Sequence, residues 1–65
     1  MGKKPTQLTF EDAVSVWLMR WAGTYQHDIA AHFWVNQGRI SEILNGYLHP
    51  GSEAAARRVA GSAKS

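Results

Sequence analysis

The chain has 65 residues, enough for one small domain, and a domain of this size buries only about 60% of its unfolded surface. It contains no cysteine, which excludes disulfide bridges, thiolate metal sites and cysteine nucleophiles. Seven Lys and Arg against five Asp and Glu give a net charge of +2, too small to indicate a polyanionic partner by itself. We find no apolar run of membrane-spanning length and no signal peptide, and we expect a cytoplasmic protein without a membrane partner.

The first predicted helix covers about 9–22. Residues 1–8 before it are expected to form a flexible, polar arm. Thr9 is a good N-cap, and Asp12 lies at the spacing of the acidic partner in a capping box. Gly23 is expected to stop the helix.

This helix carries more apolar residues than one core face requires. One stripe at helical spacing is predicted to face the core: Phe10, Ala13, Val14, Trp17 and Trp21. Three further apolar residues lie off that stripe: Val16, Leu18 and Met19. These surplus residues are expected either to form an interface or to be buried against the C-terminal helix.

Two short helices are predicted on either side of a joint at 34–36. Thr24 or Tyr25 begins the first of them, and Thr24 is the better cap. Asn36 caps the second, at about 37–45, which Asn45 and Gly46 stop. The predicted inward residues of the pair are Ile29, Ala30, Phe33, Val35, Ile40, Ile43 and Leu44.

The segment "GYLHPG" predicts a turn, because Pro50 and Gly51 both interrupt helices. A last helix is expected at 53–60, capped by Ser52 and favoured by its alanines. Residues 61–65 are expected to fray. No segment has the pattern of a strand, so the sequence predicts an all-α domain at 9–60.

The apolar order over residues 26–45 resembles the helix-turn-helix family of DNA-binding domains, including small bacterial or phage-type regulators. The residues that carry the resemblance are Ile29, Ala30, Phe33, Val35, Ile40 and Ile43. It extends to residue 10 if 10–21 is the supporting first helix. The family implies a three-helix helix-turn-helix domain, here with a short fourth helix at the C-terminus.

Trp34 departs from the family at the joint. The family prefers glycine there because the backbone tends toward positive φ, where a bulky residue costs on the order of 1 kcal/mol. Either the turn is distorted or the indole makes a compensating contact. The side chain is expected to cover the edge of the core, or else to take part in a dimer or DNA contact.

In the family, the second helix of the motif enters the major groove, so the resemblance implies sequence-specific binding of double-stranded DNA by a transcriptional regulator. The residues that would face bases are Gln37, Gly38, Ser41, Glu42 and Asn45. The candidates for phosphate contact are Asn36, Arg39, Gln26, His27, Tyr47, Arg57, Arg58, Lys3 and Lys4. For Gly38, close approach to the duplex competes with tight packing at the helix start.

The family also implies a homodimer on paired half-sites about 10 base pairs apart. The surplus apolar residues of the first helix, with Trp34 and Tyr47, are candidates for the dimer surface.

The alternative function is a protein-protein interaction module that uses the apolar surface around Leu18, Met19 and Trp34. Catalysis is not expected, because His27 and His32 do not share a helix face and neither has a paired carboxylate at ligand spacing, and because no nucleophile motif is present. Asp28 and His32, at i and i+4, are expected to form a surface pair rather than a catalytic one. We likewise expect no metal, no cofactor and no small-molecule substrate.

Overall fold

The computed structural model describes residues 8–64, with side chains through residue 61. Four helices lie in this range: α1 (Phe10–Trp21), α2 (Gln26–Phe33), α3 (Gln37–Leu44) and α4 (Ser52–Lys64). The described residues contain no strand, so the all-α prediction is confirmed. None of their helices has both the length and the apolar character that crossing a bilayer requires.

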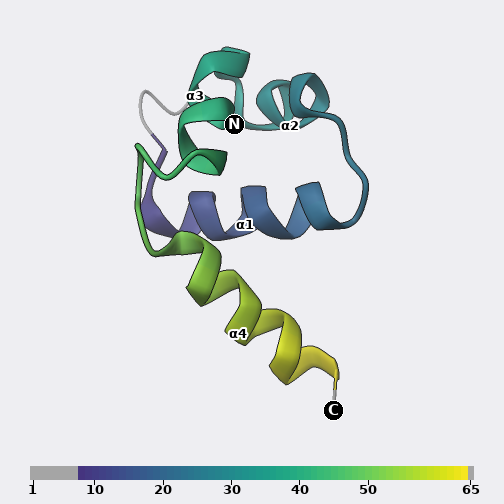
Figure 1. Cartoon of the computed structure of the whole chain (residues 1–65). Coiled ribbons are helices and arrows are strands. Elements are labelled where there is room, and N and C mark those ends of the chain that lie inside the picture. Colours follow the sequence, from purple (N-terminus) through teal and green to yellow (C-terminus); the bar gives the residue numbers. More distant parts are fainter. Residues whose placement is uncertain (1–7, 65) are drawn as a thin grey trace.

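α1 is the central helix of the fold. The α2–α3 pair lies on one side of it and α4 on the other, so that α4 leaves the body of the domain in a different direction (Figure 1). Because α1 is covered from two sides, it carries more apolar residues than a helix with a single buried face.

The start of α1 is fixed by the predicted capping box. The Thr9 hydroxyl accepts a hydrogen bond from the Asp12 amide at 3.1 Å, and the Asp12 carboxylate accepts one from the Thr9 amide at 3.0 Å. The helix ends at Trp21, and Gly23 follows with φ of 99°, a conformation that suits glycine.

The core differs from the predicted stripe of α1. Its main cluster consists of Leu8, Ala13, Val16, Ile29, Ala30, Ile40 and Ile43. Val16 was predicted to lie off the stripe but is fully buried, whereas Phe10 and Trp21 keep substantial exposure. The stripe was predicted for one covered face. The buried Ala13 and Val16 instead pack with residues of α2 and α3, whereas Trp17 and Trp21 contact residues of α4.

Leu8 also corrects the prediction of an arm through residue 8. Its side chain joins the core, and its carbonyl oxygen lies 2.7 Å from Nε2 of His49, in the segment between α3 and α4. His49 itself has φ of 51°, in the left-handed region. The predicted arm at 1–7, with Lys3 and Lys4, lies outside the described residues.

The N-cap of α2 is Tyr25 rather than Thr24, and no side chain caps this end. The Thr24 amide donates to the Met19 carbonyl at 3.1 Å, and the Gly23 amide donates to the Arg20 carbonyl at 3.0 Å. Thr24 is therefore part of the backbone hydrogen bonding that closes α1, which the cap preference of its side chain did not indicate.

α4 begins at Ser52, which was predicted to stand before the helix as its cap. The Ser52 hydroxyl is buried and accepts a hydrogen bond from the indole N–H of Trp17 at 3.1 Å. The helix continues to Lys64 rather than ending near residue 60. Its alanines have a high helix propensity, and the helix continues through Gly61.

Candidate functional site

The joint between α2 and α3 has three residues: Trp34, Val35 and Asn36. Trp34 has φ of 62° and ψ of 39°, the left-handed conformation for which the family prefers glycine. The Val35 amide donates to the Ala30 carbonyl at 3.0 Å, which closes the end of α2. The backbone of the turn is therefore regular despite its bulky first residue.

The residue of the joint that packs against the core is Val35 and not Trp34. The Trp34 side chain is 60% exposed, whereas the half-buried Val35 packs against the core cluster. Sequence reasoning anticipated the role of Val35, but the expectation that Trp34 covers the core edge is not matched by so exposed a side chain.

The start of α3 is held by Asn36. Its side-chain oxygen accepts a hydrogen bond from the Arg39 amide at 3.1 Å, as the sequence predicted for a cap. A Cβ on Gly38 would stand 3.0 Å from this oxygen, closer than an ordinary contact. Packing at the helix start therefore accounts for Gly38 without a partner.

α3 has one buried and one accessible side. Ile40 and Ile43 are fully buried and anchor the helix on the domain. The polar side chains occupy the remaining surface, where Gln37, Arg39 and Asn45 are exposed and Ser41 and Glu42 are half-buried. Four of the five residues predicted to face bases thus lie on one short helix. The fifth, Asn45, is its C-cap, and its side chain donates to the Ser41 carbonyl at 2.9 Å.

Arg39 and Glu42 form an ion pair on this surface. Arg39 Nη1 lies 3.1 Å from Glu42 Oε1, and the two side chains are 57% and 45% exposed. Sequence reasoning gave the two residues separate roles and missed their contact, although the i, i+3 spacing is a known signal for such a pair.

The segment that holds α2 and α3 carries a slightly negative net charge. Between Tyr25 and Leu48 the charged residues are Asp28, Arg39 and Glu42, so one cation and two anions give −1 with neutral histidines. The other basic residues of the chain lie outside this segment. Within α2 and α3, attraction to phosphates therefore has to come from Arg39, backbone amides and polar side chains.

The candidate phosphate contacts on α2 lie in its first turn. Gln26 is half-buried, and His27 is exposed. The His27 ring stacks on Tyr25, with 5.9 Å between ring centroids, and its Nε2 lies 3.4 Å from the Asp28 carboxylate. Tyr47, after α3, is 82% exposed.

Arg57 and Arg58 belong to α4, which lies across α1 from α2 and α3 (Figure 1). Arg57 donates to the Glu53 carboxylate at 2.7 Å, and its guanidinium lies 5.7 Å from the centroid of the Trp21 ring. The structure therefore does not bring these two arginines together with the polar side of α3.

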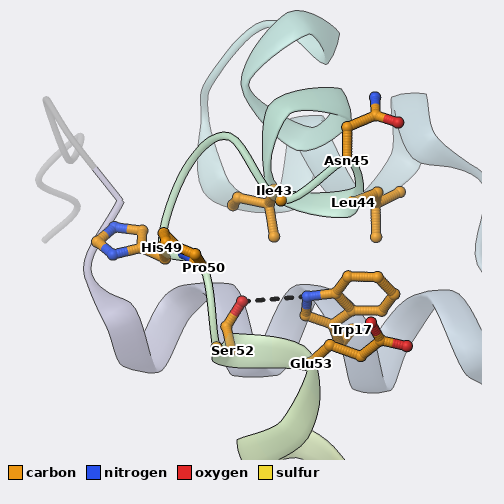
Figure 2. A pocket seen from close by; sticks show the side chains of 10 residues that line it. Trp17, Ile43, Leu44, Asn45, His49, Pro50, Ser52 and Glu53 are labelled. Atoms are coloured by element: carbon orange, nitrogen blue, oxygen red, sulfur yellow. Dashed lines mark hydrogen bonds between the residues drawn. The ribbon is translucent and has the colours of Figure 1, made fainter.

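A shallow pocket of about 200 Å³ lies where the end of α3 and the start of α4 meet α1. Figure 2 shows the Trp17 indole at one wall, bonded to Ser52, with Ile43 and Leu44 above it. Ligand pockets usually span about 300–1,000 Å³, so this one is small for a substrate. Within the described residues, no three His, Asp or Glu side chains gather as metal ligands would.

The apolar surface proposed for a protein partner is only partly accessible. Leu18 and Met19 are half-buried, and Met19 packs against the core. The large apolar side chains with real exposure are Phe10, Trp21, Tyr25, Trp34, Tyr47 and Val59. Val16, a candidate for the dimer surface, is buried and cannot contribute to one.

No protein-family model matches the sequence, and comparison with curated proteins and with solved structures gives no significant match. The candidate site therefore has to be judged on its own geometry.

Proposed function

We propose that the chain binds double-stranded DNA in a sequence-specific way, with α3 in the major groove, as a transcriptional regulator. The observation that carries the proposal is α3 itself: Ile40 and Ile43 fix one side to the domain, and the other side is accessible and rich in hydrogen-bonding groups. A single helix of this width fits the major groove. The regular three-residue turn before it supports the same placement.

In this arrangement Gln37, at the start of α3, is placed to bond an adenine through two hydrogen bonds. Ser41 and Asn45 follow along the helix toward its far end. Arg39, with Gln26 and His27 at the start of α2, supplies contacts to the backbone. Because a single copy offers few cations, we propose that two copies bind paired half-sites about 10 base pairs apart.

The experiment is a salt titration of binding to a mixed-sequence duplex by the wild type and by Arg39→Ala. We expect log K to fall linearly with log salt, and the slope of Arg39→Ala to be smaller by about one counterion. Arg58→Ala is the matched control, because it removes the same charge from α4, on the far side of α1.

An unchanged slope for Arg39→Ala together with a reduced slope for Arg58→Ala would move the DNA surface from α3 to α4. No binding at about 50 mM salt, where backbone contacts are strongest, would end the DNA proposal.

A second candidate function is a protein-interaction module, favoured by the exposed indole of Trp34 and by the slightly negative net charge of the segment that holds α2 and α3. It predicts binding of a protein partner with little dependence on salt. Trp34→Ala would then abolish that binding and Arg39→Ala would not, which is the reverse of the order expected for DNA.

A further inference from the structure

We propose that Glu42 is a specificity determinant. In the free protein its carboxylate forms an ion pair with Arg39, and in the complex it makes the DNA interface selective for a base pair that presents a cytosine amino group. This inference rests on the proposed binding of DNA by α3. In this role Glu42 contributes to the specificity of binding and not to its affinity.

The two residues of the pair lie one helical turn apart on α3. The Arg39 amide is tied to the Asn36 side chain at 3.1 Å, and its guanidinium lies 3.1 Å from the Glu42 carboxylate. Both residues stand on an eight-residue helix whose other side is buried. Arg39 is also the single Lys or Arg between Tyr25 and Leu48, so no neighbouring cation on α2 or α3 replaces it.

A phosphate that approaches Arg39 meets this carboxylate. Either the ion pair breaks, or the phosphate comes within a few Å of a like charge. Both routes weaken every complex in which Arg39 contacts only the backbone. Glu42 therefore lowers non-specific affinity more than a neutral residue of the same size does.

A suitable base pair removes this penalty. The carboxylate of Glu42 accepts a hydrogen bond from a cytosine amino group, which is a donor at the edge of the major groove. The guanidinium has five donors, so Arg39 is able to turn toward a phosphate or a guanine while the carboxylate is satisfied by the base. The cost remains in random DNA and is relieved at the operator.

The test uses the full chain as wild type and Glu42→Gln, with binding measured to a random duplex and to a sequence selected by the wild type. We expect Glu42→Gln to bind random DNA on the order of fivefold more tightly, the change for one unit charge removed about 4 Å from a phosphate in water. Affinity for the selected sequence should not rise, so the ratio of specific to non-specific binding falls.

Asp28→Asn is the matched control. It also removes one exposed negative charge, but from the first turn of α2, where the carboxylate lies beside His27 instead of Arg39. We expect it to strengthen binding to both duplexes by the same factor, which leaves the ratio unchanged. The helical circular dichroism of both variants should match the wild type, because neither side chain is buried.

The inference fails if Glu42→Gln changes both affinities equally, or if the wild type binds DNA but selects no cytosine-containing site. In either case the salt-dependent binding of the wild type would leave the proposed function standing. If neither protein binds either duplex at low salt, the proposed function fails first.

Discussion

Trp34 is held in a backbone conformation that large side chains rarely adopt. Its φ of 62° and ψ of 39° lie in the left-handed region, which costs L-residues roughly 1–2 kcal/mol. The turn keeps this conformation because the amides of Trp34 and Val35 both bond to carbonyls at the end of α2. The joint therefore holds a strained backbone conformation, although the Trp34 side chain is 60% exposed.

We predict that Trp34→Gly is more stable than Trp34→Ala by about 1 kcal/mol, because both variants lose the indole and only glycine removes the left-handed penalty. Urea denaturation of the two variants measures this difference. At the exposed Ala31, inside α2, the order should reverse, and Ala31→Gly should cost about 1 kcal/mol. Equal stability of the two Trp34 variants would contradict a strained turn.

At the scale of the element, the start of α3 depends on two residues at once. The Asn36 side chain caps the helix and also takes the space that a side chain at position 38 would need. Replacing a glycine inside a helix by alanine normally stabilises the fold by about 0.5–1 kcal/mol. Here that gain is opposed by displacement of the cap.

We predict that Gly38→Ala gives no stabilisation in the wild type, yet stabilises the Asn36→Ala variant by about 0.5–1 kcal/mol. Asn36→Ala alone should cost about 1 kcal/mol, because it removes the cap from the Arg39 amide. Thermal or urea unfolding of the four proteins completes the cycle. Stabilisation by Gly38→Ala in both backgrounds would show that the cap and the glycine are independent.

A part-buried hydrogen bond between side chains joins α1 to α4. The Trp17 indole donates to the Ser52 hydroxyl, and Ser52 is only 1% exposed (Figure 2). Removing either partner leaves the other with an unsatisfied polar group.

We predict that Ser52→Ala and Trp17→Phe each destabilise the domain, Ser52→Ala by about 1 kcal/mol, and that the double variant loses less than the sum of the two. The size of the coupling should be about 1 kcal/mol by urea denaturation. Ser15→Ala, half-buried on the same helix, serves as the control and should not couple to Ser52→Ala. Additive losses would mean that the hydrogen bond contributes little.

For the whole molecule, the sequence predicted those features that local signals determine. The capping box at Thr9, the Asn36 cap and the burial of Ile40 and Ile43 each follow from a few neighbouring residues. The polar set on α3 is also readable from helical spacing, and the structure places it on an accessible side.

The remaining features depend on contacts between distant segments. Leu8 and Val16 are both buried because they join the core cluster that α1 forms with residues of α2 and α3. Ser52 looked like a cap but bonds to a residue 35 positions away. The pairing of Arg39 with Glu42 is local, and its spacing alone would have indicated it.

The two parts of α4 should contribute very unequally to stability. Its first half carries Ser52 and the fully buried Ala56, whereas Val59 and the residues up to Gly61 are exposed. We predict that deleting 52–65 abolishes cooperative unfolding, since it uncovers α1, and that deleting 62–65 changes stability by less than about 0.5 kcal/mol. Circular dichroism during heating measures the unfolding of both variants. A cooperative transition in the variant that lacks 52–65 would show that the other three helices form a domain alone.

The contact between the Leu8 carbonyl and the His49 ring also determines where a purification tag should be placed for assays. A purification tag fused before residue 1 is tethered to this point by seven residues, a reach of at most about 25 Å. The loop that follows α3, which holds His49, therefore lies within reach of the tag. A tag placed after the last residue hangs from α4, which points away from α2 and α3 (Figure 1). Affinity measurements on DNA should therefore use the C-terminal fusion or the cleaved chain.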